Sequence, residues 1–507
     1  MSQSHFDPNI VISWPTACYS VSNIPFYAGN PLIDALPSIN SEQDTYRQLQ
    51  YFPEFRARDR MAPDHERFHY IYNLGTFFRP LSIHLNLESR ISIMLRSGYK
   101  ARNPVQKNYY RNLSDKKSLP DMASKRSPSF YIVGMSGVGK STGVEQILKL
   151  YPQVLRHTQY HGKPFNFFQI IWLKIDCPFD GSVTGLCLNI FQEIDQLLGT
   201  NYRKTLGEEN RPNIPALLLN LRCLVRLHGI GCIVIDEIQQ LSVAKGQGVT
   251  SMLNFFVNLV NDSEAPIILI GTPKALPLLR REFQQARRAS GLGDLYWPPM
   301  ENDIHLGNES EWLCFTDKLL EYQYVRQPTR ESRESLSEAL YSASAGIVDF
   351  AVKTFILAQF RAIETKTECL TKQLIASVAS DSFSFANDIL EKIRSRRFNE
   401  LENIPDIGLF DLGNYYRDRK AREARESYKQ ILRQEKSTLV VPPASEVPIV
   451  SKPRTKRKIL PQNDLAQINL TQSDLRYVFS KAQKVNLSMA DELRTAGYIK
   501  NVSEFTL

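Results

Sequence analysis

The feature that most constrains this 507-residue chain is the octapeptide Gly134-Met-Ser-Gly-Val-Gly-Lys-Ser141. An apolar run, Phe130–Val133, precedes it, and an amphipathic stretch, Lys140–Leu150, follows it. The octapeptide satisfies the pattern G-x-x-x-x-G-K-[ST]. Glycines let the main chain turn its amides inward around an anion, and a helix N-terminus adds partial positive charge at the same place. The sequence therefore predicts a strand, a phosphate-binding loop and a helix, in that order.

The residues of this loop are expected to bind ATP. Lys140 is expected to reach the β- and γ-phosphates, and Ser141 to ligate Mg²⁺. A chance glycine-rich turn is the alternative, and the flanking strand and helix disfavour it. The predicted nucleotide-binding residues are Gly134, Met135, Ser136, Gly137, Val138, Gly139, Lys140, Ser141 and Thr142.

A second apolar run, Cys232–Ile235, ends in the two carboxylates of Asp236 and Glu237. Asp236 is predicted to hold Mg²⁺ through its waters, and Glu237 to orient and polarise the attacking water. The alternative is a pair of acids that merely begin a helix. The run follows the phosphate loop by about a hundred residues with β/α units between them, which favours the catalytic interpretation.

Two further features complete the predicted catalytic set. A third run, Pro266–Ile270, is followed by Thr272, which stands where a polar residue can contact the γ-phosphate or the water; a plain turn at a strand end is the alternative. Arg287 and Arg288 end a basic helix and are candidates for an arginine that a neighbouring subunit supplies to the transferring phosphoryl group. A solvated basic face or a DNA contact is the alternative for these arginines.

Residues 126–305 alternate short apolar runs with amphipathic stretches and predict an α/β fold. Continuous apolar runs indicate strands buried on both faces, hence a parallel sheet flanked by helices. The expected strands are Ser129–Val133, Phe168–Ile175, Cys232–Ile235 and Ile267–Ile270. The expected helices are Lys140–Leu150, Val183–Leu198, Ile214–His228, Met252–Val260 and Lys274–Ser290.

Residues 306–399 follow a helical pattern throughout, which predicts a small helical lid domain after the sheet domain. The candidate helices are Glu309–Tyr322, Glu331–Ser342, Val348–Ala362 and Thr371–Ala379.

The rest of the chain divides into three predicted regions. Residues 1–125 form a mixed N-terminal region that is expected to bind a partner, with a helix near Leu81–Arg96. Residues 400–463 combine a charged helix with a flexible basic linker. Residues 464–507 regain apolar spacing but are too few for an independent core, which predicts a flexible tail that docks on a partner.

Composition indicates an anionic partner and a cytoplasmic setting. The formal net charge is +9, which favours nucleic acid, although a solvated basic surface explains it as well. No run reaches about 18 apolar residues and no basic n-region opens the chain, so neither a membrane span nor a secretory signal is expected. The seven cysteines include no C-x-x-C pair, which is typical of reduced thiols in the cytoplasm.

The order of phosphate loop, Asp-Glu strand, Gly-Thr-Pro strand, Arg-Arg helix and helical lid resembles that of AAA+ ATPases of the initiator type. More specifically, the chain resembles TnsC, the AAA+ target-selection regulator of Tn-seven-like transposons. The stretches most specific to that family are Asn30–Pro37, Leu87–Tyr99 with Arg102–Pro104, and Asp474–Tyr477. Lys174–Cys177, Val234–Gln239, Met252–Phe256, Leu269–Lys274 and Ala286–Arg288 also fit, whereas residues 400–463 match poorly.

The resemblance implies an ATP- and Mg²⁺-dependent regulator of DNA transposition in a bacterial cytoplasm. TnsC proteins assemble as rings or filaments on double-stranded DNA and connect a TnsD/TniQ-type target selector to the transposase. The C-terminal tail is similar to the part that binds a TnsA-type endonuclease subunit. DNA contacts are implied at Ser182, Thr184, Arg203 and Lys204, with little base specificity because they address phosphates. A charged turn at a helix end is the alternative for the last two residues.

Hydrolysis is expected to reset this assembly, and two other functions stay open. One is a scaffold that binds ATP without hydrolysing it, which Glu237 and the arginine helix disfavour. The other is a replication initiator or clamp loader of the same fold; a winged-helix domain after the lid would favour it, and none is evident in residues 400–507. Lys353, in the third lid helix, is the nearest candidate for a second sensor of the nucleotide.

Overall fold

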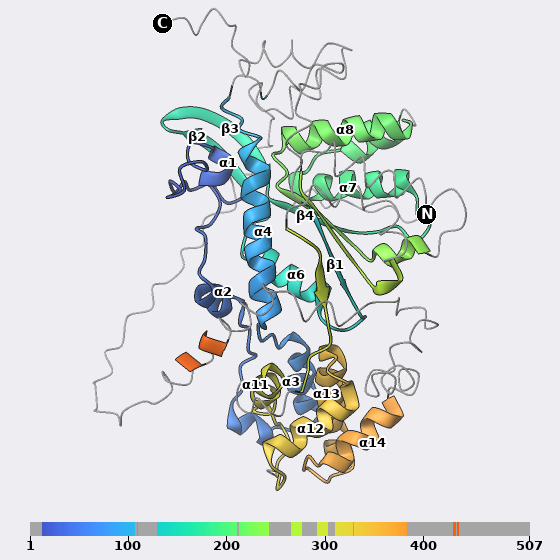
Figure 1. Ribbon diagram of the computed structural model, residues 1–507. Helices are drawn as coiled ribbons and strands as arrows, with labels where there is room; N and C mark the ends of the chain where they lie inside the picture. Colours follow the sequence, from blue (N-terminus) through green and yellow to red (C-terminus); the bar gives the residue numbers. More distant parts are fainter. Residues whose placement is uncertain are drawn as a thin grey trace, which may run out of the picture.

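A parallel sheet of five strands lies at the centre of the upper half of the molecule (Figure 1). The computed structural model describes residues 13–106, 109, 129–209, 212–242, 265–275, 292–302, 310–327, 329–382, 429–431 and 433–434. In spatial order the strands are β4 (Trp172–Asp176), β5 (Cys232–Asp236), β6 (Ile267–Gly271), β1 (Phe130–Gly134) and β7 (Leu295–Trp297). All neighbours pair in parallel, so their carboxyl ends meet at one edge of the sheet.

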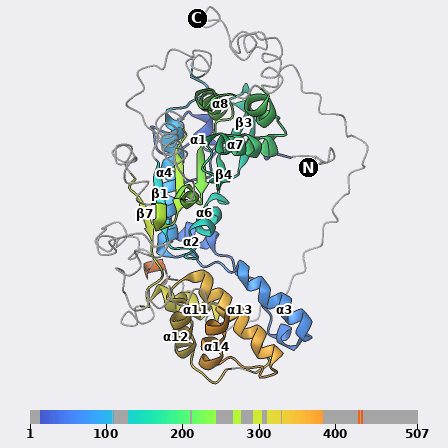
Figure 2. The ribbon, with the colours of Figure 1, turned by 90° about the vertical axis from the view of Figure 1, so that its right-hand side faces the viewer.

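Helices cover the sheet, as the continuous apolar runs predict. Both β5 and β6 are buried along their whole length. The long helix α4 (Ser82–Lys100) packs along α6 (Lys140–Leu148), while α7 (Val183–Leu198) packs against β4 and α8 (Ile214–Leu227) (Figures 1 and 2). The predicted parallel sheet flanked by helices is therefore confirmed.

The start of α7 follows from local chemistry. Ser182 accepts a hydrogen bond from the amide of Gly185 and so satisfies a donor that the first turn leaves open. The helix ends at Gly199, which takes the left-handed conformation (φ 67°) that favours glycine.

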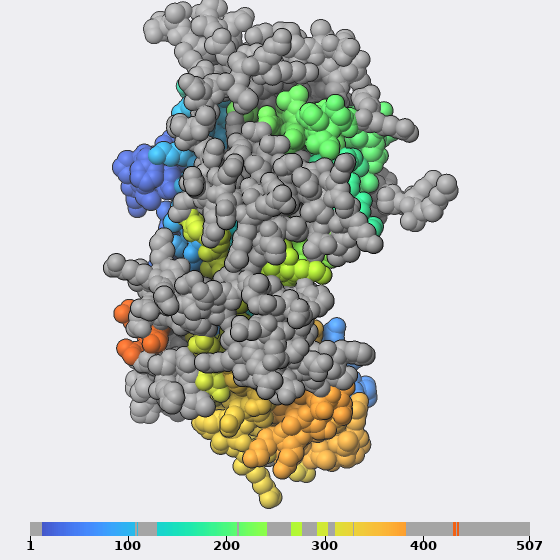
Figure 3. All heavy atoms as spheres, turned by 45° about the vertical axis from the view of Figure 1, so that its right-hand side comes forward, coloured from blue at the N-terminus to red at the C-terminus, as the bar shows by residue number. Residues whose placement is uncertain are grey.

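A helical lid domain forms the other end of the molecule. Its helices are α11 (Glu311–Leu319), α12 (Arg333–Ser344), α13 (Val348–Glu364) and α14 (Lys372–Ser382). They share the lid core, a buried apolar cluster that includes Trp312, Phe355 and Ile363. In the space-filling view the lid helices (yellow to orange) and α7–α8 (green) lie at opposite ends of the visible face (Figure 3).

The N-terminal region contributes to both cores. It contains α1 (Pro31–Asp34), α2 (Glu42–Leu49), η1 (Ala57–Met61), α3 (Asp64–Tyr72) and η2 (Asn73–Thr76). Leu32 and Ile33 join the sheet core, the cluster around β1, β5 and β6, whereas Ile71 and Leu74 join the lid core. The segment between α3 and α4 therefore runs from one core to the other.

A buried ion pair fastens α3 to the lid. The guanidinium of Arg67 donates to both carboxylate oxygens of Glu368, at 2.5 and 2.7 Å, and to the carbonyl of Tyr324 at 3.0 Å. Glu368 follows α13, and Arg67 is fully buried. A guanidinium suits this place because its fork matches a carboxylate with two bonds.

A β-hairpin made of β2 (Val154–Tyr160) and β3 (Lys163–Ile170) stands apart from the central sheet. The expected single strand Phe168–Ile175 is wrong: its first residues end β3 and the rest form β4. The chain changes partners at this point, because β3 pairs with β2 whereas β4 pairs with β5 of the central sheet. An apolar run alone does not reveal such an exchange of partners.

The other expected helices agree with the structure to within a few residues, including the one near Leu81–Arg96. Met252–Val260, most of Lys274–Ser290 and all but a few of residues 400–507 lie outside the described residues. Within the described residues, none of the single helices has the length and apolar composition to cross a bilayer. In the part of the chain that the structure describes, α12 and α13 pass that test together, as a pair bent by 118°.

Candidate functional site

The phosphate loop joins the carboxyl end of β1 to the N-terminus of α6. Gly137 and Gly139 have φ values of 81° and 101°, in the left-handed region that favours glycine. Gly134 is needed for space instead, because a Cβ there would lie 2.4 Å from the carbonyl oxygen of Trp297 in β7. The loop thus combines two bends that need glycine with one close approach of a neighbouring strand.

Lys140 points back into this loop. Its Nζ donates to the carbonyl oxygens of Gly134 and Met135, at 2.8 and 2.7 Å, and the residue is buried. The ammonium group therefore sits within the turn, where an anion enclosed by the loop would meet it. Ser141 and Thr142 follow in the first turn of α6.

Acidic residues lie at the same edge of the sheet, at the end of β5. One oxygen of the buried Asp236 accepts from the amide of Glu237 at 2.8 Å, and the other lies 3.3 Å from the ammonium of Lys174. The carboxylate of Asp236 and the hydroxyl of Ser141, in the first turn of α6, are oxygen donors of the kind that Mg²⁺ prefers.

Glu237 follows Asp236 in a left-handed conformation, with φ 58°. Partial burial, and next the charge of Asp236, raise the pKa of this carboxyl group, while the charges of Lys140 and Lys174 oppose the rise. Glu237 remains accessible to solvent, and the charges of Lys140 and Asp236 both act on its carboxyl group. This placement suits a group that accepts a proton from water.

Thr272 lies at the end of β6, the strand between β5 and β1. Its hydroxyl oxygen is buried and forms no hydrogen bond. Its amide donates to the side-chain oxygen of Gln239, at 3.1 Å. A buried hydroxyl without a partner is costly and is typical of a site that a ligand completes.

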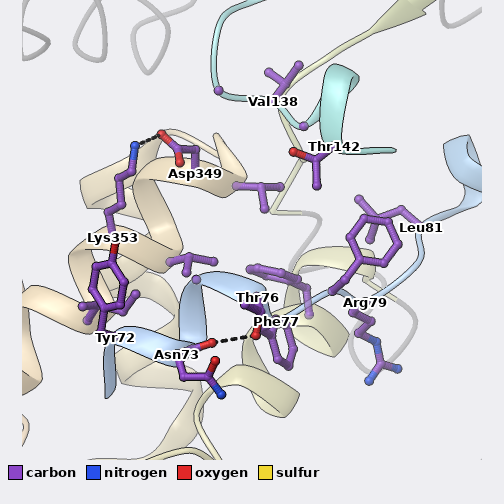
Figure 4. A pocket seen from close by; sticks show the side chains of 18 of the residues that line it. Tyr72, Asn73, Thr76, Phe77, Arg79, Leu81, Val138, Thr142, Asp349 and Lys353 are labelled. Atoms are coloured by element: carbon purple, nitrogen blue, oxygen red, sulfur yellow. Dashed lines mark hydrogen bonds and ion pairs between the residues drawn. The ribbon is translucent and has the colours of Figure 1, made fainter. Parts of the chain in front are cut away.

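A pocket of about 670 Å³ opens beside the phosphate loop (Figure 4). One wall is the loop with Thr142, the second is α13 of the lid, and the third is the segment from Tyr72 to His84. The volume and the largely apolar, aromatic lining are typical of a pocket for a small organic ligand. The lining residues include Tyr72, Phe77, Arg79, Leu81, His84, Val138, Thr142, Phe315, Asp349, Lys353 and Phe360.

The lid touches the loop directly. The amide of Asp349 donates to the carbonyl of Gly137 at 3.1 Å, and a Cβ on Gly137 would lie 3.0 Å from Ile347. The side chain of Lys353 lines the pocket and pairs with Asp349 at 2.6 Å (Figure 4).

Residues 124–279 match the family model described as an AAA domain. The matched residues contain the phosphate loop, the end of β5 and the end of β6. The chain carries an AAA-type P-loop ATPase domain. Together with the five-stranded parallel sheet and the helical region that follows it, this match confirms the predicted AAA+ fold class.

Several solved structures are similar to this chain. A Walker-type ATPase of Pyrococcus abyssi is 16% identical with a TM-score of 0.34, covering 54% of this chain and 72% of its own. The ORC2 protein of Aeropyrum pernix, in ADPNP-ADP complexes, is 12% identical with a TM-score of 0.33 and coverage of 64% and 98%. Cdc6p of Pyrobaculum aerophilum is 11% identical with a TM-score of 0.34 and coverage of 64% and 84%. No match is found among curated proteins.

The sequence pattern does not predict the third wall of the pocket beside the phosphate loop. Residues 72–84 precede the loop by about fifty positions, and no local pattern marks them as part of a ligand site. His84, at the end of this wall, has a defined hydrogen bond and protonation state in the structure. Its Nδ1 accepts from the amide of Leu81 at 2.9 Å, so Nε2 bears the proton, and burial lowers the pKa of the ring to about 3.

Of the four residues implied in DNA contact, two lie at the N-terminus of α7 and two lie in η3 (Arg203–Glu208), the short helix that follows it. Ser182 caps α7, and Thr184 is exposed in its first turn. Arg203 donates to Glu208 at 2.9 Å and also to Gln192.

Lys204 lies 3.8 Å from Glu209, and its side chain is 62% exposed. Both basic residues therefore have acidic neighbours within the AAA domain. Arg287 and Arg288 lie outside the described residues.

Proposed function

We propose that this chain binds ATP with Mg²⁺ and hydrolyses it to ADP and phosphate. The observation that supports this most is the meeting of Lys140 in the phosphate loop with Asp236 and Glu237 at one edge of the sheet. Loop amides, one lysine and two successive carboxylates are the parts that phosphoryl transfer needs.

Each residue has a distinct role in this proposal. Lys140 exchanges the carbonyls of Gly134 and Met135 for phosphate oxygens, while the loop amides enclose the phosphate chain. Ser141 and Asp236 would hold Mg²⁺, which supplies charge stabilisation when it is bound. Glu237 orients the attacking water and accepts its proton.

Thr272 completes the proposed site from the end of β6. Its buried hydroxyl would gain a partner from the terminal phosphate or from the water. The pocket between the loop, α13 and residues 72–84 would take the base and ribose, since its aromatic lining offers flat apolar surfaces.

At the level of the whole protein, we propose a TnsC-like regulator of DNA transposition. The support is the set of family-specific stretches, Asn30–Pro37, Leu87–Tyr99 and Asp474–Tyr477, together with a net charge of +9. In this role the chain assembles on double-stranded DNA as a ring or filament and links a TnsD/TniQ-type target selector to the transposase. ATP favours the assembled state because it gains contacts there from a neighbouring copy, through Arg287 or Arg288.

The ATPase proposal is tested with purified protein and two substitutions. Lys140→Ala should abolish ATP binding, measured by titration with a fluorescent ATP analogue. Glu237→Gln should keep binding and slow phosphate release about 100-fold or more. If the wild-type protein releases no phosphate above background, so that Glu237→Gln changes neither phosphate release nor the lifetime of the assembly, the scaffold that does not hydrolyse ATP is favoured instead.

The assembly proposal is tested by electron microscopy with duplex DNA. Rings or filaments should form with a non-hydrolysable ATP analogue, be absent with ADP, and be absent in Lys140→Ala. Binding should weaken steeply with salt, because phosphate contacts release counterions. A protein that stays monomeric on DNA under every nucleotide condition would overturn the proposal.

The tail proposal needs a separate experiment. Removing residues 464–507 should preserve ATP binding and abolish capture of a TnsA-type endonuclease subunit in a pull-down with the purified partner. Retained capture would contradict the docking role of these residues.

A further inference from the structure

The side chain of Gln239 lies between two parts of the proposed site. It belongs to η4 (Ile238–Ser242), the turn that follows Glu237. Its Oε1 accepts from the amide of Thr272 at 3.1 Å, and its Nε2 donates to Oε2 of Glu237. Since the amide only donates and the carboxylate only accepts, these two partners fix which way the carboxamide points.

The packing around Gln239 holds this bridge in place. A Cβ on Gly271 would lie 2.4 Å from Cγ1 of Ile238 and 3.1 Å from Oε1 of Gln239. Glycine at the end of β6 therefore lets η4 approach this closely. Glu237, which directly precedes η4, adopts the left-handed conformation with a φ of 58°.

We propose that Gln239 is a positioning residue, which fixes the carboxylate of Glu237 and links it to the end of β6. This inference rests on the proposed ATPase function. Gln239 binds Oε2 of Glu237 and leaves Oε1 to meet the attacking water. The buried hydroxyl of Thr272 has no hydrogen bond, so a phosphate that engages Thr272 acts on the same residue whose amide holds Gln239.

Three substitutions separate this role from a merely structural one. Gln239→Glu keeps an acceptor for the Thr272 amide but places a second carboxylate against Glu237. Gln239→Met keeps the length of the side chain and removes both hydrogen bonds. Gln240→Glu is the control, because it adds the same charge to the next residue. The main-chain amide of Gln240 donates to the carbonyl of Glu237 at 3.0 Å, and the substitution keeps this bond.

Steady-state hydrolysis and binding of a non-hydrolysable ATP analogue are measured for each variant. Gln239→Glu and Gln239→Met should lower kcat about 100-fold, as expected for a misplaced catalytic group. Their KM and analogue affinity should stay within about 2-fold of wild type, because neither substitution touches the phosphate loop. Gln240→Glu should resemble wild type in all three quantities. A wild-type kcat in Gln239→Glu would overturn the proposal.

The decisive comparison repeats Gln239→Met in a Glu237→Gln background, with residual phosphate release measured in a single turnover. If Gln239 acts through Glu237, the added substitution lowers the residual rate by less than about 3-fold. An equal loss in both backgrounds would overturn the proposal and leave Gln239 a structural residue. If wild type binds ATP but releases no phosphate, the ATPase proposal and this inference fail together, whereas an active wild type tests Gln239 alone.

Discussion

Single residues in the phosphate loop are dictated by two different constraints. Gly134 is required by space, because a Cβ there would lie 2.4 Å from the carbonyl oxygen of Trp297. Gly139 is required by its backbone, since φ is 101° and no atom lies within 4 Å of a Cβ built there. The sequence motif contains both kinds of glycine without distinguishing them, and only the neighbours in space separate the two.

Replacing Gly139 with Ala should therefore separate strain from crowding. The left-handed conformation of an alanine should lower the free energy of unfolding by about 1–2 kcal/mol, measured by urea denaturation. ATP affinity should fall about 10-fold or more, because relief of the strain turns the loop amides away from the phosphates. Gly162→Ala is the matched control, since Gly162 also has a positive φ (73°) and open space around a Cβ. It should lose similar stability and keep ATP affinity; equal ATP affinity in the two variants would contradict the prediction.

Two buried histidines should make the protein sensitive to mild acid. Burial lowers the pKa of His84 to about 3 and that of His157 to about 4, from an ordinary value of 6.5. Below pH 6.5 the unfolded chain binds protons at these rings and the folded chain does not, so stability falls with pH through this window. Each contributes about 1.4 kcal/mol per pH unit, or about 4 kcal/mol for both between pH 7 and pH 5.

The measurement is the free energy of unfolding in urea at those two pH values. His84→Gln should lose about half of the pH dependence. His161→Gln, at the exposed tip of the hairpin, should keep all of it. A stability that does not change between pH 7 and pH 5 would contradict the assignment of buried, neutral rings.

At the scale of elements, the sequence predicts the strands and helices whose signals are local. Val183–Leu198 is a helix as expected, because its apolar spacing and its cap lie within one stretch. Elements defined by distant partners are not predicted by local sequence patterns. The three-residue strand β7 exists through pairing with β1, and residues 72–84 become a pocket wall only when α13 lies opposite them. Neither relation leaves a periodic pattern in the sequence.

The contact between α3 and the lid should be costly to break. Arg67→Met removes the partner of the buried Glu368 and should destabilise the protein by about 3–5 kcal/mol. Arg361→Met is the matched control, because Arg361 joins α13 to Asp381 of α14 through an exposed pair at 2.7 Å. The control should cost less than about 1 kcal/mol. Urea unfolding measures both, and similar losses would show that the burial of the Arg67 pair adds nothing.

At the scale of the whole molecule, the sheet core and the lid core meet at the pocket. The loop touches α13 through Gly137 and Asp349, and the segment after α3 closes the third side. A ligand held there contacts elements of both cores at once.

ATP should therefore stabilise both cores together. At about 100 times its dissociation constant, ATP should raise the free energy of unfolding by about 2.7 kcal/mol. Hydrogen exchange should show added protection in α13 of the lid as well as in α6 next to the loop. Lys140→Ala should show neither effect, and protection confined to α6 would mean that the lid takes no part in binding.

The third wall of the pocket also has a consequence for any partner that binds the chain N-terminal to the phosphate loop. Linked equilibria are reciprocal: a molecule that holds α3 more firmly when the pocket is filled raises the affinity for the pocket's ligand by the same factor. The stretch from Tyr72 to His84 would transmit this coupling between α3 and the pocket, since it borders the pocket and connects α3 to α4. Binding of such a partner would then change the fraction of molecules that hold nucleotide, even though the partner does not contact the phosphates.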